Sequence, residues 1–142
     1  MSPQGVPVLL VDGHNVIHAW KDLRELHRQR PAQARLELCR RLTSFQDMTD
    51  TKVVVAFDGR GPQLGVEATT IQVFYAPAAG SADTIIARLA SRYADQYPLT
   101  VASDDLAVQH SVAAAGGSWI STEALRDLID RAMGEFRRRW DL

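Results

Sequence analysis

Four aspartates stand where the sequence is most able to do chemistry. Asp12, Asp58 and Asp104 each follow an apolar run with the character of a buried strand, and Asp83 begins a helical segment. The carboxyl ends of parallel strands share one edge of an α/β sheet, and ligands bind there, where the strand order reverses. If the strands that end in Asp12 and Asp104 are neighbours, these two carboxylates face each other across that crevice, and Asp83 enters it from the preceding helix.

Carboxylates held this close repel one another, and a bound cation is the usual remedy. Oxygen ligands without His or Cys suit Mg²⁺ or Mn²⁺, and such an ion activates water and clamps a phosphate during in-line displacement. Each aspartate also has an ordinary role: an Asp-Gly turn for Asp12 and Asp58, a helix N-terminus for Asp83, a helix cap for Asp104 or Asp105. Taken together, Asp12, Asp83 and Asp104 predict a metal site, whereas both interpretations stay open for Asp58.

Polar neighbours supply candidates for binding a substrate. Asn15 follows Asp12 by one helical turn, and its amide either binds phosphate or caps a short helix. His14 and His18 have metal-ligand spacing but lack the Glu of a zinc-binding H-E-x-x-H motif, so His14 is expected only to line the site. Arg60 is expected near the crevice mouth, against RNA phosphates or simply in solvent. Surface or packing roles are expected for the other two histidines, His27 and His110.

The elements that must position these residues alternate along the chain. Strands are expected at 8–11, 52–57, 70–75, 99–102 and 119–120, the third near an edge of the sheet. Helices are expected at 32–48, 82–97, 106–115 and 121–139, with a short helical or looped segment over 14–20. This alternation predicts an α/β fold with a mainly parallel five-stranded sheet flanked by helices, formed by a single domain over residues 1–142.

Composition is that of an ordinary globular chain. Of 142 residues, 46% are apolar and 23% are charged, which excludes disorder and coiled coil. The single cysteine, Cys39, excludes an intrachain disulfide framework and a thiolate zinc cluster. No apolar run approaches membrane-helix length and no signal-peptide pattern is present, so a soluble cytoplasmic protein without a membrane partner is expected. A net charge of −1 argues against strong, indiscriminate nucleic-acid binding.

Three short segments give the chain a family resemblance. They are Val11-Asp12-Gly13-His14-Asn15, Ser81-Ala82-Asp83-Thr84 and Val101-Ala102-Ser103-Asp104. In this order and spacing they resemble the NYN domains of the PIN-like nuclease superfamily, and most of all the YacP-like branch, over residues 8 to about 137. The resemblance implies a three-layer α/β PIN-like fold that cleaves RNA with Mg²⁺ or Mn²⁺.

The resemblance also implies roles for individual residues. Asp12, Asp83 and Asp104 would be the catalytic metal ligands, with Ser103 beside the last of them. Asn15 would orient a ligand or the substrate phosphate. Asp58 occupies an F-D position of the branch, and Asp105 has no fixed place in its pattern. Supporting or substrate-binding roles therefore fall to six residues: Asn15, Ser103, Asp105, Asp58, Arg60 and His14.

The predicted function is a metal-dependent endoribonuclease that hydrolyses RNA phosphodiester bonds with an activated water. The resembling branch includes ribosome-associated enzymes that act on mRNA; the sequence itself predicts neither a particular target nor an oligomeric state. One alternative is a non-catalytic PIN-like module that binds RNA or protein. Another is a phosphoacceptor receiver-like domain, because Asp58 ends a strand where a phosphoacceptor would. That alternative would want an acidic pair after the first strand, and only Asp12 is present.

Overall fold

A parallel sheet of five strands organises the chain in this computed structural model, which describes residues 5–59, 71–76 and 81–140. The strands are β1 (Val8–Asp12), β2 (Lys52–Asp58), β3 (Gln72–Ala76), β4 (Leu99–Ala102) and β5 (Ser118–Ile120). Their order is β3-β2-β1-β4-β5, and every neighbouring pair is parallel. The α/β class is confirmed, with β1 beside β4 and β3 at an edge; the sheet is wholly rather than mainly parallel.

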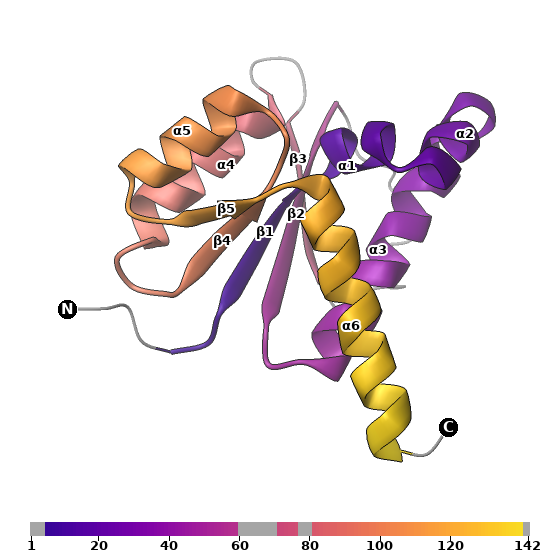
Figure 1. Ribbon diagram of the computed structural model, residues 1–142. Helices are drawn as coiled ribbons and strands as arrows, with labels where there is room; N and C mark the ends of the chain where they lie inside the picture. Colours follow the sequence, from indigo (N-terminus) through magenta and orange to yellow (C-terminus); the bar gives the residue numbers. More distant parts are fainter. Residues whose placement is uncertain (1–4, 60–70, 77–80, 141–142) are drawn as a thin grey trace.

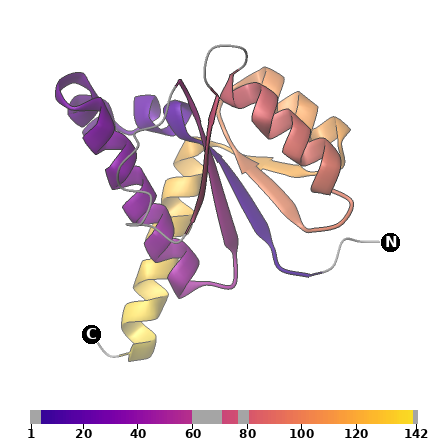
Figure 2. The same cartoon turned by 180° about the vertical axis from the view of Figure 1, so that it is seen from behind.

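Helices cover both faces of the sheet (Figure 1), and the view from behind shows the same division (Figure 2). One face carries α1 (Gly13–Ala19), α2 (Lys21–Gln29), α3 (Pro31–Met48) and α6 (Thr122–Trp140), and the other carries α4 (Ala82–Tyr93) and α5 (Leu106–Ala114). Side chains alternate along a strand. Leu9 and Val11 of β1 therefore join the core under the first group, and Leu10 joins the core under the second.

Helix α2 is the element that the sequence pattern did not predict. Its sequence is strongly polar, and Leu23 is its only fully buried residue. Trp20 separates it from α1 with an extended backbone, and the indole Nε1 donates a hydrogen bond to the Thr122 carbonyl oxygen at 3.1 Å. Tertiary anchoring by Trp20 and Leu23 therefore fixes a short, polar helix in which Leu23 alone is fully buried.

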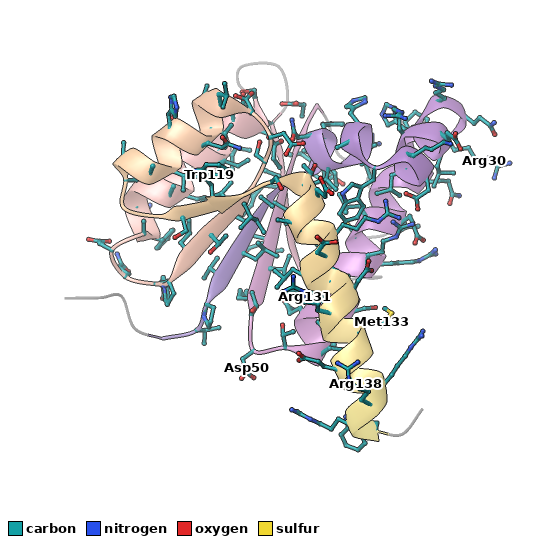
Figure 3. All side chains as sticks on the ribbon, in the orientation of Figure 1. Arg30, Asp50, Trp119, Arg131, Met133 and Arg138 are labelled. Carbon is teal, nitrogen blue, oxygen red and sulfur yellow. The ribbon has the colours of Figure 1, made fainter. Side chains whose placement is uncertain are left out.

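The parallel arrangement places the polar residues that follow the strands at one edge of the sheet. The strands all end at one edge, and α1, α4, α5 and α6 begin there. Arg138, near the other end of α6, lies far from that edge, so the basic end of this helix is not part of it (Figure 3). No helix in the described part of the chain combines the length and apolar character needed to span a bilayer.

Candidate active site

An open pocket of about 490 Å³ lies at the carboxyl edge of the sheet. Four aspartates line it, from the end of β1, the end of β2, the first turn of α4 and the residue before α5: Asp12, Asp58, Asp83 and Asp105. Asn15 and three histidines complete the lining: His14, His18 and His27. We call this the acidic pocket. It contains Asp12 and Asp83 together, as the sequence predicted, but not Asp104.

Asp12 is the most deeply placed of these carboxylates, with only 4% of its surface exposed. Its Oδ2 accepts a hydrogen bond from Ser103 Oγ at 2.8 Å. Burial, helped by the negative charges of Asp83, Asp58 and Asp105, raises the pKa of Asp12 from 3.8 to about 6. The hydrogen bond from Ser103 acts in the opposite direction. Asp12 is thus a buried carboxylate whose charge the described residues leave largely uncompensated.

Gly13 allows α1 to begin directly behind Asp12. A Cβ at this position would collide with the ring of Phe57. The dipeptide Asp12-Gly13 is therefore not an ordinary turn: its glycine makes room for the Phe57 ring. By contrast, Gly59 has a φ of 84°, so Asp58-Gly59 does follow the expected turn chemistry.

Asp58 and Asp105 serve helix N-termini and still line the acidic pocket. Oδ1 of Asp58 accepts a hydrogen bond from the Ala82 amide at 2.7 Å, at the start of α4. Oδ1 of Asp105 accepts one from the Ala107 amide at 2.8 Å and so caps α5. Each uses one oxygen for these bonds. The structural role and a role in the pocket are therefore compatible in both residues.

Asp83 is exposed in the first turn of α4. Partial desolvation raises the pKa of Asp83, and the charges of Asp105 and Asp58 add to that effect. Asp83 therefore experiences the same kind of like-charge repulsion as Asp12.

Asp104 lies elsewhere. Its Oδ1 accepts a hydrogen bond from the Thr122 amide at 2.9 Å, and its Oδ2 accepts one from Thr122 Oγ1 at 2.7 Å. Both oxygens are thus occupied at the start of α6, and Asp104 lines a separate pocket with Trp20 and Arg126. The expected meeting of Asp104 with Asp12 and Asp83 does not occur. Asp105, the next residue in the connection between β4 and α5, lines the acidic pocket instead.

Ser103 and Asn15 hold the two sides of the crevice together. The fully buried Ser103 hydroxyl donates to Asp12 and accepts a hydrogen bond from the Asp105 amide at 3.1 Å. Oδ1 of Asn15 accepts a hydrogen bond from the Asp104 amide at 2.8 Å. The end of β4 is therefore fastened to β1 by one residue and to α1 by the other. Both residues lie where the sequence predicted support for the site.

The histidines form the other side of the pocket. Nδ1 of His14 accepts a hydrogen bond from the Asp58 amide at 3.0 Å, so the proton of the neutral ring is on Nε2. Burial lowers the pKa of His14. The 3.6 Å separation between Nδ1 of His14 and Oδ2 of Asp58 is accordingly not an ion pair. His27 was expected on the surface or in packing, and no sequence signal indicated its approach from α2.

The donor set fits a hard divalent cation in chemistry and charge. Carboxylate and amide oxygens are the ligands that Mg²⁺ and Mn²⁺ prefer. The described residues that line the acidic pocket include no lysine or arginine to balance the aspartates. As the described side chains stand, no three of the His, Cys, Asp and Glu type converge closely enough to hold an ion. The predicted Arg60 lies outside the described residues.

Comparisons with known proteins agree with this outline. Residues 9–141 match the sequence pattern of the YacP-like NYN domain. The uncharacterized protein YacP of Bacillus subtilis (strain 168) is 39% identical over 51 residues, a stretch that spans 36% of this chain and 30% of that relative. Two crystal structures of Rae1 (YacP) from Bacillus subtilis, one of a mutant, are similar in fold. Their TM-scores are 0.79 and 0.75 at 26% and 27% identity, over 93% and 94% of this chain and 79% of each of theirs.

Proposed function

The chain belongs to the YacP-like NYN domain family, a nuclease-like family, and on this basis we propose that it is a divalent-metal-dependent endoribonuclease. It would hydrolyse RNA phosphodiester bonds. The observation that supports this best is the acidic pocket, where the buried Asp12 and three further aspartates gather without a described cationic side chain. A nuclease needs such a concentration of uncompensated negative charge to recruit cations between itself and a phosphate.

Asp12 and Asp83 are the metal ligands in this proposal, with Mg²⁺ or Mn²⁺ as the ion. The motif resemblance favours Asp104 as the third ligand, whereas the geometry of the acidic pocket favours Asp105. We adopt Asp105, because both oxygens of Asp104 are already occupied by Thr122. Oδ2 of Asp105 forms no hydrogen bond with any described residue.

In this proposal, individual residues of the chain have separate roles in hydrolysis. A divalent cation, when bound, neutralises the carboxylates, makes water a better nucleophile and balances charge on the phosphate. Ser103 fixes the orientation of the Asp12 carboxylate and favours its ionised form. His14 presents a neutral Nε2–H donor, because Nδ1 is engaged by the Asp58 amide. Asn15 holds the β4–α5 connection against α1.

We place this activity in the cytoplasm, on mRNA, with the ribosome as a partner. This part of the proposal follows from the family resemblance alone. A net charge of −1 gives the chain little general attraction for free RNA, so an RNA presented by a partner would suit it.

The direct test is cleavage of an end-labelled single-stranded RNA by the purified protein with Mn²⁺. We expect cleavage that EDTA abolishes and that Asp12→Asn removes, while His110→Ala on the far exposed face of α5 behaves like the unchanged protein. Ribosomes translating a defined mRNA serve as a second substrate. Absence of metal-dependent cleavage on both substrates would contradict the proposal, as would cleavage that survives Asp12→Asn.

A further inference from the structure

Three of the four histidines in the chain gather on one side of the acidic pocket. His14 and His18 lie one turn apart on α1, and His27 reaches them from α2. The ring of His18 is 6.3 Å from that of His14 and 5.2 Å from that of His27, centroid to centroid. We call these three residues the histidine cluster. Two helices thus supply a compact group of nitrogen donors beside the carboxylates.

The histidine cluster differs in charge from the carboxylates that it faces. Nε2–H is the free donor of His14. The imidazole N–H groups of the histidine cluster are hydrogen-bond donors without negative charge, and such donors suit an anion.

An RNA strand brings more than one anion to the pocket. The phosphate being cleaved has to meet the aspartates, where cations compensate the repulsion. The next phosphate along the strand is only a nucleotide away and needs donors that are not carboxylates. Within the lining of the acidic pocket, the described side chains that offer such donors are those of the histidine cluster and Asn15.

We propose that the histidine cluster is a subsite for the RNA phosphodiester adjacent to the one that is cleaved. The identity of the strand as RNA rests on the proposed function. His18 and His27 contact the phosphate, and both line the acidic pocket.

The test follows the imidazole nitrogens of the ¹⁵N-labelled protein by NMR during titration with a 2′-O-methyl RNA hexamer in EDTA. Signals of His14, His18 and His27 should shift, whereas those of His110 should not. A hexamer with uncharged methylphosphonate linkages should shift them far less. No shifts, or equal shifts with the uncharged strand, would overturn the subsite. This readout requires no substitution, so it does not depend on how a variant folds.

A paired experiment separates the subsite from the proposed function. The double variant His18→Ala/His27→Ala should raise the Kd for the hexamer and the KM for cleavage by about tenfold, with the smaller effect on kcat. His110→Ala is the matched control. Cleavage with an unchanged KM in the double variant would leave the nuclease standing and refute the subsite. If the imidazole signals shift only with the charged strand, but no metal ion activates cleavage, the subsite would stand and the proposed nuclease function would be refuted.

Discussion

Asp104 and Asp105 are consecutive residues with opposite uses. Asp104 turns toward α6, where the Thr122 amide and hydroxyl donate to its two oxygens. Asp105 turns toward the acidic pocket, where it gives one oxygen to the first turn of α5 and faces Asp12 and Asp83. One carboxylate is fully satisfied by the protein, and the other stands among like charges.

Asp104 and Asp105 show how a structural aspartate can be distinguished from a candidate functional one at this edge of a parallel sheet. Helix N-termini crowd here, so almost any aspartate finds an amide to accept from. A capping bond alone therefore decides nothing. The aspartates of the acidic pocket carry negative charge that their described hydrogen bonds do not balance. This effect is largest at the buried Asp12.

The substitution Asp12→Asn removes the most deeply buried charge of the acidic pocket and should have the largest effect on the rate of cleavage. We expect RNA cleavage to fall more than about a hundredfold, since loss of an outer-shell partner alone typically costs 10–100-fold. The fold should survive, because Asn still accepts the hydrogen bond from Ser103. Initial rates with Mn²⁺ measure the loss, and circular dichroism checks the fold. A variant that retains its rate would remove Asp12 from the site.

The second prediction concerns how the free energy of unfolding depends on pH. The folded protein binds a proton at Asp12 more tightly than the unfolded chain does, so stability is lost as pH rises from about 4 through about 6. The loss from this group is about 3 kcal/mol, at 1.36 kcal/mol per pKa unit. Urea unfolding of the metal-free protein should show it, and Asp12→Asn should not.

Two features make that measurement specific to Asp12. The lowered pKa of His14 gives a slope of opposite sign below its ordinary value, but it does so in both proteins and cancels from their difference. Adding Mn²⁺ at pH 7 should recover stability in the unchanged protein and not in the variant. Identical pH profiles for the two proteins would mean that burial costs Asp12 little.

The paired variants Asp105→Asn and Asp104→Asn test which of these two aspartates is the third ligand. Both keep an acceptor oxygen for their helix N-termini, so neither should unfold the protein. We expect Asp105→Asn to lower the cleavage rate about tenfold or more and Asp104→Asn to change it by less than about threefold. The reverse order would return the third ligand position to Asp104, as the motif resemblance suggests.

Asp104→Ala should have the smallest effect, and it should fall on stability. Removing the acceptor leaves the Thr122 amide and hydroxyl unpaired at the start of α6, at a cost of about 1 kcal/mol. Chemical denaturation would measure it, with Asp104→Asn as the control that keeps an acceptor oxygen for the Thr122 amide. Stability equal to that of the unchanged protein would show that water replaces the carboxylate without loss.

Much of this arrangement could be predicted from the sequence. The apolar runs located all five strands, and the structure meets the condition that the expected site set, namely that β1 lies beside β4. Asp12 and Asp83 meet because every parallel strand ends at the same edge. The choice between Asp104 and Asp105 could not be predicted, because it depends on a single peptide unit after β4. Pattern and composition are identical for either orientation.

The histidine cluster escaped prediction for a different reason. His14 and His18 share a helix, so their spacing is visible in the sequence, whereas His27 belongs to α2. That helix is strongly polar and is anchored by Trp20 and Leu23. The approach of His27 to α1 depends on these tertiary contacts, which the spacing of residues along the chain does not give.

The central place of β1 has a consequence for the synthesis of the chain. Ser103, which orients Asp12, follows it by 91 positions. At about 5–20 residues per second, translation reaches Ser103 roughly 5–20 seconds after Asp12. During that interval β1 has no β4 to pair with, and Asp12 has neither its hydroxyl partner nor Asp105 opposite. The acidic pocket of a nascent chain would therefore stay incomplete until β4 and the start of α5 had been made and had folded onto β1.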